Sequence, residues 1–183
     1  VLAYHYVRDL NISEYPRIKG LHVDNFISQL DYLEKFYEFL TIEDCIAAIQ
    51  RNKRIPLNSI ILTFDDGYID HYETVLPILL ERGIQGSFFP PGKAVQEFKV
   101  LDVNKIHFLL AKITDISIIL RATFNLLDKY RGKYNLESND FYYSKLAKEN
   151  RFDGKDIMFI KSLLQRGLEY EVRNKITSDL FYK

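Results

Sequence analysis

A short apolar segment that ends in two carboxylates constrains this chain more than any other. Residues 59–67 read SIILTFDDG, so β-branched and aromatic side chains lead directly into Asp65, Asp66 and Gly67. Such a run is typical of a strand buried on both faces, as in a parallel sheet. Sites in α/β folds lie at the carboxyl ends of strands, and charges placed there cost free energy unless they are paired or bind a ligand. The segment therefore predicts a functional site at the two aspartates.

The residues around this segment alternate between strand and helix patterns. The order strand, helix, strand over residues 59–89 predicts a parallel βαβ unit. The predicted elements are strands at 1–7, 59–64 and 85–89, with helices at 24–39, 41–51 and 70–83. The fold class is therefore α/β.

Three sequence signals refine these helices. Thr41 opens a capping box at the second helix. Pro77 lies inside the third helix and predicts a kink or a displaced start, and Gly83 suits the position after its last turn. We expect the second helix to bury one apolar side, with Cys45 as a structural thiol. That side consists of Ile42, Cys45, Ile46 and Ile49.

The second half of the chain has a different pattern. After Gly92 only helices are predicted, with Asp115 and Ser138 as candidate N-caps. We therefore divide the chain into an α/β part at 1–92 and a helical part at 93–183. The predicted helices lie at 103–113, 116–130, 141–148, 155–164 and 170–183.

Composition narrows the classes of partner. The 183 residues have a formal net charge of +0 and no basic stripe, so we expect no nucleic-acid partner. No apolar run is long enough to span a membrane, and no signal peptide opens the sequence. The single cysteine, Cys45, excludes an internal disulfide. Compartment and oligomeric state stay open.

Two adjacent carboxylates can take different chemical roles in one site. Like charges disfavour joint ionisation unless a cation occupies the site, and Gly67 allows the turn that brings both side chains to the rim. One carboxylate can then bind a divalent metal while the other accepts a proton from a metal-bound water. The simpler alternative is that Asp65, Asp66 and Gly67 form only a β-turn.

The sequence Thr63-Phe64-Asp65-Asp66-Gly67 resembles the first motif of the polysaccharide deacetylase family, the NodB-like carbohydrate esterases. Tyr4-His5 and Phe88-Phe89 also lie where members of this family place strands, so the resemblance covers 1–92. It implies the N-terminal part of a distorted (β/α) barrel, with 93–183 as a helical insertion or subdomain. The implied activity is metal-dependent removal of an N- or O-acetyl group from a carbohydrate or cell-envelope polysaccharide.

The resemblance also implies residue roles. Asp65 would be the general base, and Asp66 would bind a divalent metal, usually zinc, that polarises the acetyl carbonyl. Tyr68, Pro91 and Gly92 are candidate substrate-binding residues at the mouth of the site, with packing as the alternative for each.

Two histidines near this mouth have open roles. His5 is a candidate third metal ligand or substrate contact, and the alternative is a buried histidine bonded to a backbone carbonyl. His71 could approach the metal, although a capping or solvated role fits its position at the start of a helix.

The chain departs from the family pattern at its second metal motif. Its histidines are His5, His22, His71 and His107, so the expected His-x-x-x-His is absent. One remaining ligand is too few for zinc. We expect an N-terminal fragment whose helices precede missing strands, with the remaining ligands outside the chain. The alternative is a degenerate relative that binds a carbohydrate or a protein partner without catalysis.

Overall fold

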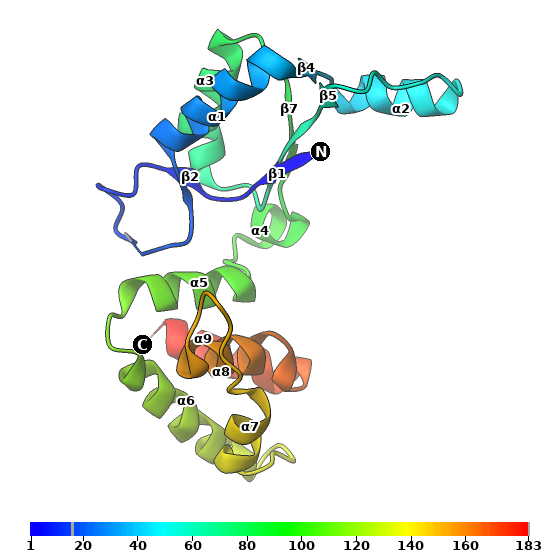
Figure 1. Cartoon of the computed structure of the whole chain (residues 1–183). Coiled ribbons are helices and arrows are strands. Elements are labelled where there is room, and N and C mark those ends of the chain that lie inside the picture. The colour runs from blue at the N-terminus through cyan, green and yellow to red at the C-terminus, as the bar shows by residue number, and fades with distance from the viewer. Residues whose placement is uncertain (16, 183) are drawn as a thin grey trace. The chain divides into compact units, whose positions relative to one another are not determined.

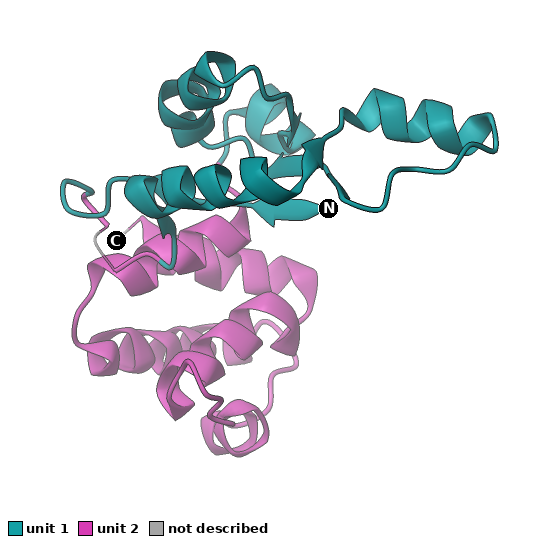
Figure 2. Ribbon diagram, turned by 45° about the horizontal axis from the view of Figure 1, so that its top comes forward, with its two compact units in different colours: residues 1–13, 19–99 teal, residues 14–18, 100–183 magenta. Residues whose placement is uncertain are grey.

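The computed structural model describes residues 1–15 and 17–182 and shows a mixed α/β chain in two compact units. Unit 1 contains Val1–Ser13 and Lys19–Lys99, and unit 2 contains Glu14–Ile18 and Val100–Lys183 (Figure 2). A short segment of the N-terminal loop thus belongs to the helical unit. Lys183, the last residue of the helix predicted at 170–183, lies outside the described residues.

Unit 1 is built on a three-stranded parallel sheet in the order β1-β6-β7. Its strands are β1 (Leu2–Tyr4), β6 (Leu62–Asp65) and β7 (Gly86–Phe89). The predicted parallel βαβ unit is therefore confirmed, while the sheet is small and the described residues do not close a barrel. Two short parallel pairs accompany it: β2 (Val7–Arg8) with β3 (Leu21–His22), and β4 (Glu38–Phe39) with β5 (Ser59–Ile60).

The predicted strand at residues 1–7 is interrupted after Tyr4. β1 pairs with β6, whereas β2 pairs with β3, so the chain must change partner between Tyr4 and Val7. The carbonyl of His5 accepts a hydrogen bond from the His71 ring instead of joining a strand ladder. The alternating pattern of 1–7 could not show this break, because it depends on a residue 66 positions away.

One face of the sheet forms the core of unit 1. The Phe64 ring stacks on Tyr4 and Phe88, with centroids 5.3 and 4.9 Å away. Helix α1 (Val23–Phe36) covers this face with the fully buried Phe26 and Leu30. Helix α3 (Leu76–Glu81) adds Leu79 to the same cluster, and Figure 1 shows α1 and α3 beside each other. The organising strand is therefore held by aromatic and aliphatic packing.

The limits of α1 differ from the prediction. His22 caps the helix by accepting a hydrogen bond from the backbone N–H of Asp24, so the helix begins one residue before Asp24. It ends at Phe36, because the chain turns extended at Tyr37 and residues 38–39 form β4 beside β5. The predicted continuation to residue 39 was wrong, since strand pairing replaced the last helical turn.

Pro77 has the predicted effect on the third helix. The first turn, η1 (His71–Val75), is π-helical, and α3 begins only at Leu76. Proline has no N–H to close a helical hydrogen bond within the preceding turn, which favours this wider turn. Gly83 follows the helix with φ +65°, so its predicted role after the last turn is confirmed.

Helix α2 (Ile42–Gln50) forms as predicted but does not bury the apolar side that was expected to be buried. Thr41 accepts a hydrogen bond from the N–H of Asp44, which confirms the N-cap. No residue of α2 is buried, however: Ile49 is 66% exposed and Cys45 is only half-buried. The amphipathic pattern was correct for a helix but wrong about burial, because no neighbouring element of unit 1 covers its apolar side.

Unit 2 is a helical bundle with its own core. The buried residues come from all five of its helices, with Leu127, Phe159 and Ile176 among the fully buried side chains. Asp115 and Ser138 cap helices as predicted. The helices are α5 (Asp102–Lys112), α6 (Ile116–Arg131), α7 (Asn139–Leu146), α8 (Lys155–Ser162), continued by the π-helical η2 (Leu163–Gly167), and α9 (Tyr170–Phe181).

Segment 14–18 attaches to this bundle through Arg17. Its guanidinium donates to the carbonyls of Leu110, Ala111 and Ile113 at the end of α5. A cation at a helix C-terminus satisfies carbonyls that have no partner within the helix. Over the described part of the chain, none of the helices combines the length and apolar character needed to cross a bilayer.

Candidate active site

The two predicted site carboxylates lie at the carboxyl end of the central strand. Asp65 is the last residue of β6, and Asp66 starts the turn that follows. Both side chains are half-buried. Asp66 and Gly67 have φ angles of +74° and +61°, so two consecutive residues adopt the left-handed region. The turn of the simpler alternative is thus present, and it places a non-glycine carboxylate in a conformation that L-residues seldom adopt.

Gly67 is required by a close approach as well as by its φ angle. A Cβ at this position would lie 2.7 Å from Cβ of Pro90 and 3.0 Å from its Cα. The turn after β6 therefore lies directly against the residues that follow β7. Pro91 is brought close to Gly67, and it forms the N-cap of α4 (Gly92–Glu97). A Cβ at Gly92 would meet nothing within 4 Å, so Gly92 lies in open space.

Tyr68 contacts a predicted metal ligand directly. Its hydroxyl donates to Oδ2 of Asp66 at 2.5 Å, and its ring stacks on Tyr6 with centroids 4.1 Å apart and planes 24° apart. Burial raises the pKa of Tyr68 well above its usual value, and hydrogen bonds with Asp66 and Tyr6 raise it further. The phenol thus keeps its proton and remains a donor to the Asp66 carboxylate at neutral pH.

His71 is directed into the interior of the protein. It is buried, and its Nε2 donates to the carbonyl of His5 at 2.6 Å. This bond leaves Nδ1 as the acceptor, and in the described residues that buried atom has no hydrogen-bond partner. The ring also packs edge-on against Phe64. His71 therefore connects the backbone that follows β1 to the first helical turn. The side chain of His5 itself is exposed.

A buried ion pair supports the same turn. Nε of Arg8 lies 2.7 Å from Oδ2 of Asp70, and both side chains are largely buried. Asp70 precedes η1 (His71–Val75) but makes no side-chain capping bond, because Arg8 takes its carboxylate. Sequence reasoning missed Arg8 and Tyr6. No local pattern could have found them, since both act on partners 62 residues later in the chain.

The residues present do not by themselves fit a metal centre. Within 1–15 and 17–182, no group of three His, Cys, Asp or Glu side chains is arranged to hold an ion. His71 is committed to the His5 carbonyl, so Asp66 would be a single ligand beside Asp65. A zinc site needs three or four protein ligands.

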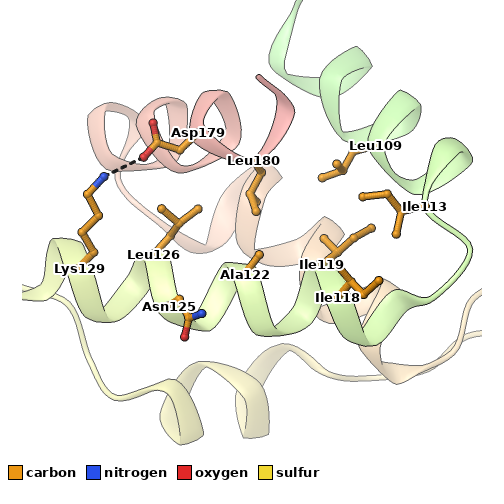
Figure 3. A pocket seen from close by; sticks show the side chains of 10 residues that line it. All are labelled: Leu109, Ile113, Ile118, Ile119, Ala122, Asn125, Leu126, Lys129, Asp179 and Leu180. Carbon is orange, nitrogen blue, oxygen red and sulfur yellow. Dashed lines mark hydrogen bonds and ion pairs between the residues drawn. The ribbon is translucent and has the colours of Figure 1, made fainter. Parts of the chain in front are cut away.

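A second candidate for the functional site is a pocket of about 500 Å³ in unit 2, shown in Figure 3. Its walls are mainly leucine and isoleucine side chains from α5, α6 and α9. Its one carboxylate, Asp179, accepts from Lys129 and from Tyr130, each at 3.1 Å. The pocket therefore lacks a free acid or base, and the chemistry of this chain is better placed at the end of β6.

Comparison with known proteins points to the same segment. The polysaccharide deacetylase family matches residues 52–112, a range that contains the entire motif at 63–67. The predicted family resemblance is confirmed. The match runs from unit 1 into α5 of unit 2.

A curated relative and two solved structures bear related names. YxkH of Bacillus subtilis (strain 168), whose name assigns it to the polysaccharide deacetylases, is 26% identical over 96 residues, covering 52% of this chain. The aligned part spans about a third (32%) of the length of YxkH.

The two structures are deacetylases of other bacteria. A de-N-acetylase from Aggregatibacter actinomycetemcomitans is similar over 49% of this chain and 36% of its own, with a TM-score of 0.42 and 27% identity. The Streptococcus pyogenes deacetylase PplD, solved with acetate, is similar over 99% of this chain and 79% of its own, with a TM-score of 0.46 and 15% identity.

Proposed function

We propose that this chain takes part in the deacetylation of a carbohydrate polymer, by hydrolysis of an N- or O-acetyl group. The observation that carries the proposal is the position of Asp65 and Asp66 at the carboxyl end of a buried parallel strand, inside the segment that matches the deacetylase family. The left-handed backbone at Asp66 supports it, because such conformations cluster at functional sites.

In this proposal Asp65 is the general base. Its carboxylate accepts a proton from the water that attacks the acetyl carbon, and proton transfer of this kind contributes about 10² to 10⁴ in rate. Tyr68 donates to Asp66, and this bond orients the Asp66 carboxylate beside the base. His5, Tyr68, Pro91 and Gly92 remain proposed substrate contacts.

Metal dependence is a finer part of the proposal. Asp66 would supply one ligand to a divalent ion such as zinc, which would polarise the acetyl carbonyl. The other ligands are not among the described side chains around it. We also propose that residues 1–92 are the N-terminal part of a distorted (β/α) barrel and that 93–183 are a helical insertion or subdomain.

Acetate release from acetylated oligosaccharides tests the proposal. The 183-residue chain is incubated with chitohexaose or acetylated xylohexaose, with and without added zinc, and we expect weak turnover because the ligand set is incomplete. Asp65→Asn should lower that rate at least about 100-fold. Glu73→Gln, an exposed carboxylate-to-amide change on η1, is the matched control and should leave the rate unchanged.

The alternative is a non-catalytic carbohydrate- or partner-binding domain, which is favoured by the lack of a three-residue ligand cluster among the described residues. If chitohexaose binds by calorimetry while no acetate appears under any metal condition, the alternative replaces the enzymatic proposal. Equal rates for Asp65→Asn and the wild type would remove Asp65 from the mechanism.

A further inference from the structure

The two faces of the β1-β6-β7 sheet differ in chemistry. Register partners in a parallel sheet point to the same face, and successive residues point to opposite faces. Tyr4 and Phe64 are partners on the packed face, where Phe88 stacks on Phe64 and is 37% exposed. The opposite face carries the rows Ala3, Thr63 and Ser87, and then Asp65 and Phe89.

Phe89 is placed beside the proposed base by this register. Asp65 and Phe89 are paired residues at the ends of β6 and β7, so their side chains emerge on the same face at the same level. Neighbouring strands of a sheet lie roughly 5 Å apart, so side chains paired across β6 and β7 are within reach of each other. Phe89 is 49% exposed, although it ends a strand whose other aromatic, Phe88, stacks on Phe64.

The environment of Phe89 suits one kind of ligand. A half-exposed aromatic ring offers a flat apolar surface, while the half-buried Asp65 and Ser87 offer hydrogen-bonding groups on the same face. A pyranose ring has the matching chemistry, because one face presents C–H groups and its edge presents hydroxyls. Aromatic rings with a few placed polar groups are the usual lining of small-molecule sites.

We propose that Phe89 is a substrate-binding residue, on which a pyranose unit of the polymer stacks with its acetyl group directed to Asp65. This inference rests on the proposed function and adds to it a surface on which the sugar stacks, the ring of Phe89, called the platform below.

The absence of tryptophan from the sequence allows a direct test. Phe89→Trp introduces a single indole at the proposed platform, and Phe98→Trp places one at a 92% exposed position of the same unit as the control. On titration with chitohexaose or acetylated xylohexaose, we expect saturable quenching and a blue shift for Phe89→Trp and no change for Phe98→Trp. Phe89→Ala should weaken binding about tenfold by calorimetry, and Phe89→Tyr should restore it.

The outcomes separate this inference from the proposed function. Binding reported by Phe89→Trp without acetate release supports the platform and counts against the enzymatic proposal. Acetate release with no fluorescence response, or with unchanged affinity in Phe89→Ala, overturns the platform alone. No binding of either oligosaccharide to the wild-type chain also overturns it.

Discussion

At the scale of single residues, the site depends on backbone conformation as much as on side-chain chemistry. Asp66 and Gly67 both adopt positive φ, and the loop after β7 packs directly on Gly67. Tyr68 then reaches back to Asp66, which the motif TFDDG alone does not indicate. The sequence predicted which acids matter, but their partners Tyr6, Arg8 and His71 follow from contacts between distant segments.

Gly67→Ala tests the close approach of the two loops. We expect the substitution to lower the free energy of unfolding of unit 1 by about 2 kcal/mol, because alanine is strained at φ +61° and its Cβ would contact Pro90. Urea unfolding followed by circular dichroism measures the loss. Gly92→Ala, where a Cβ meets nothing within 4 Å, is the control and should change stability little. Equal stability of both variants would contradict the crowding at Gly67.

At the scale of elements, hydrophobic periodicity identified helices well but did not decide which were buried. Helices α1 and α2 both have an apolar side, yet α1 packs Phe26 and Leu30 against the sheet whereas α2 buries no residue. The missing N–H of Pro77 predicted a kink or a displaced start, and the structure has a π-helical turn before it. Amphipathicity is a property of the segment, whereas burial requires a partner that the segment does not specify.

A pair of truncations distinguishes the two helices. Leu30→Ala should cost about 2–5 kcal/mol of unfolding free energy, because it leaves a cavity in the core of unit 1. Ile49→Ala should cost less than about 0.5 kcal/mol, since Ile49 is exposed. Chemical denaturation of both variants is the measurement. A large loss for Ile49→Ala would mean that the apolar side of α2 is covered in solution.

At the scale of the whole molecule, the chain contains two separate hydrophobic cores. One is centred on Phe64 and the sheet, and the other joins the helices of unit 2 around Leu127 and Phe159. The site residues discussed above belong to unit 1, while the family match extends into α5. Because each cluster is made of its own set of buried side chains, we expect each core to open on its own.

Leu127→Ala tests this independence by native-state hydrogen exchange. Leu127 is fully buried in unit 2, so the substitution should reduce the protection of amides in α6, α8 and α9 by the equivalent of about 2–5 kcal/mol. Amides of β1, β6 and β7 should keep their protection. Ile118→Ala, at an exposed position of α6, serves as the reference. Equal loss of protection in both units would show that they unfold together.

The sequence by itself determined a strand leading into the two acids, predicted at 59–64 and found as β6 at 62–65. It also determined the helix caps at Thr41, Asp115 and Ser138 and the resemblance to deacetylases. These features are local, because a strand pattern, a cap or a motif is complete within a few residues. Only the tertiary structure decided that β1 breaks after Tyr4, that Arg8 takes Asp70, that α2 is uncovered and that Phe89 lies beside Asp65. Each of these depends on strand register or on a contact between segments far apart in the chain, and neither is encoded in the periodicity of a single segment.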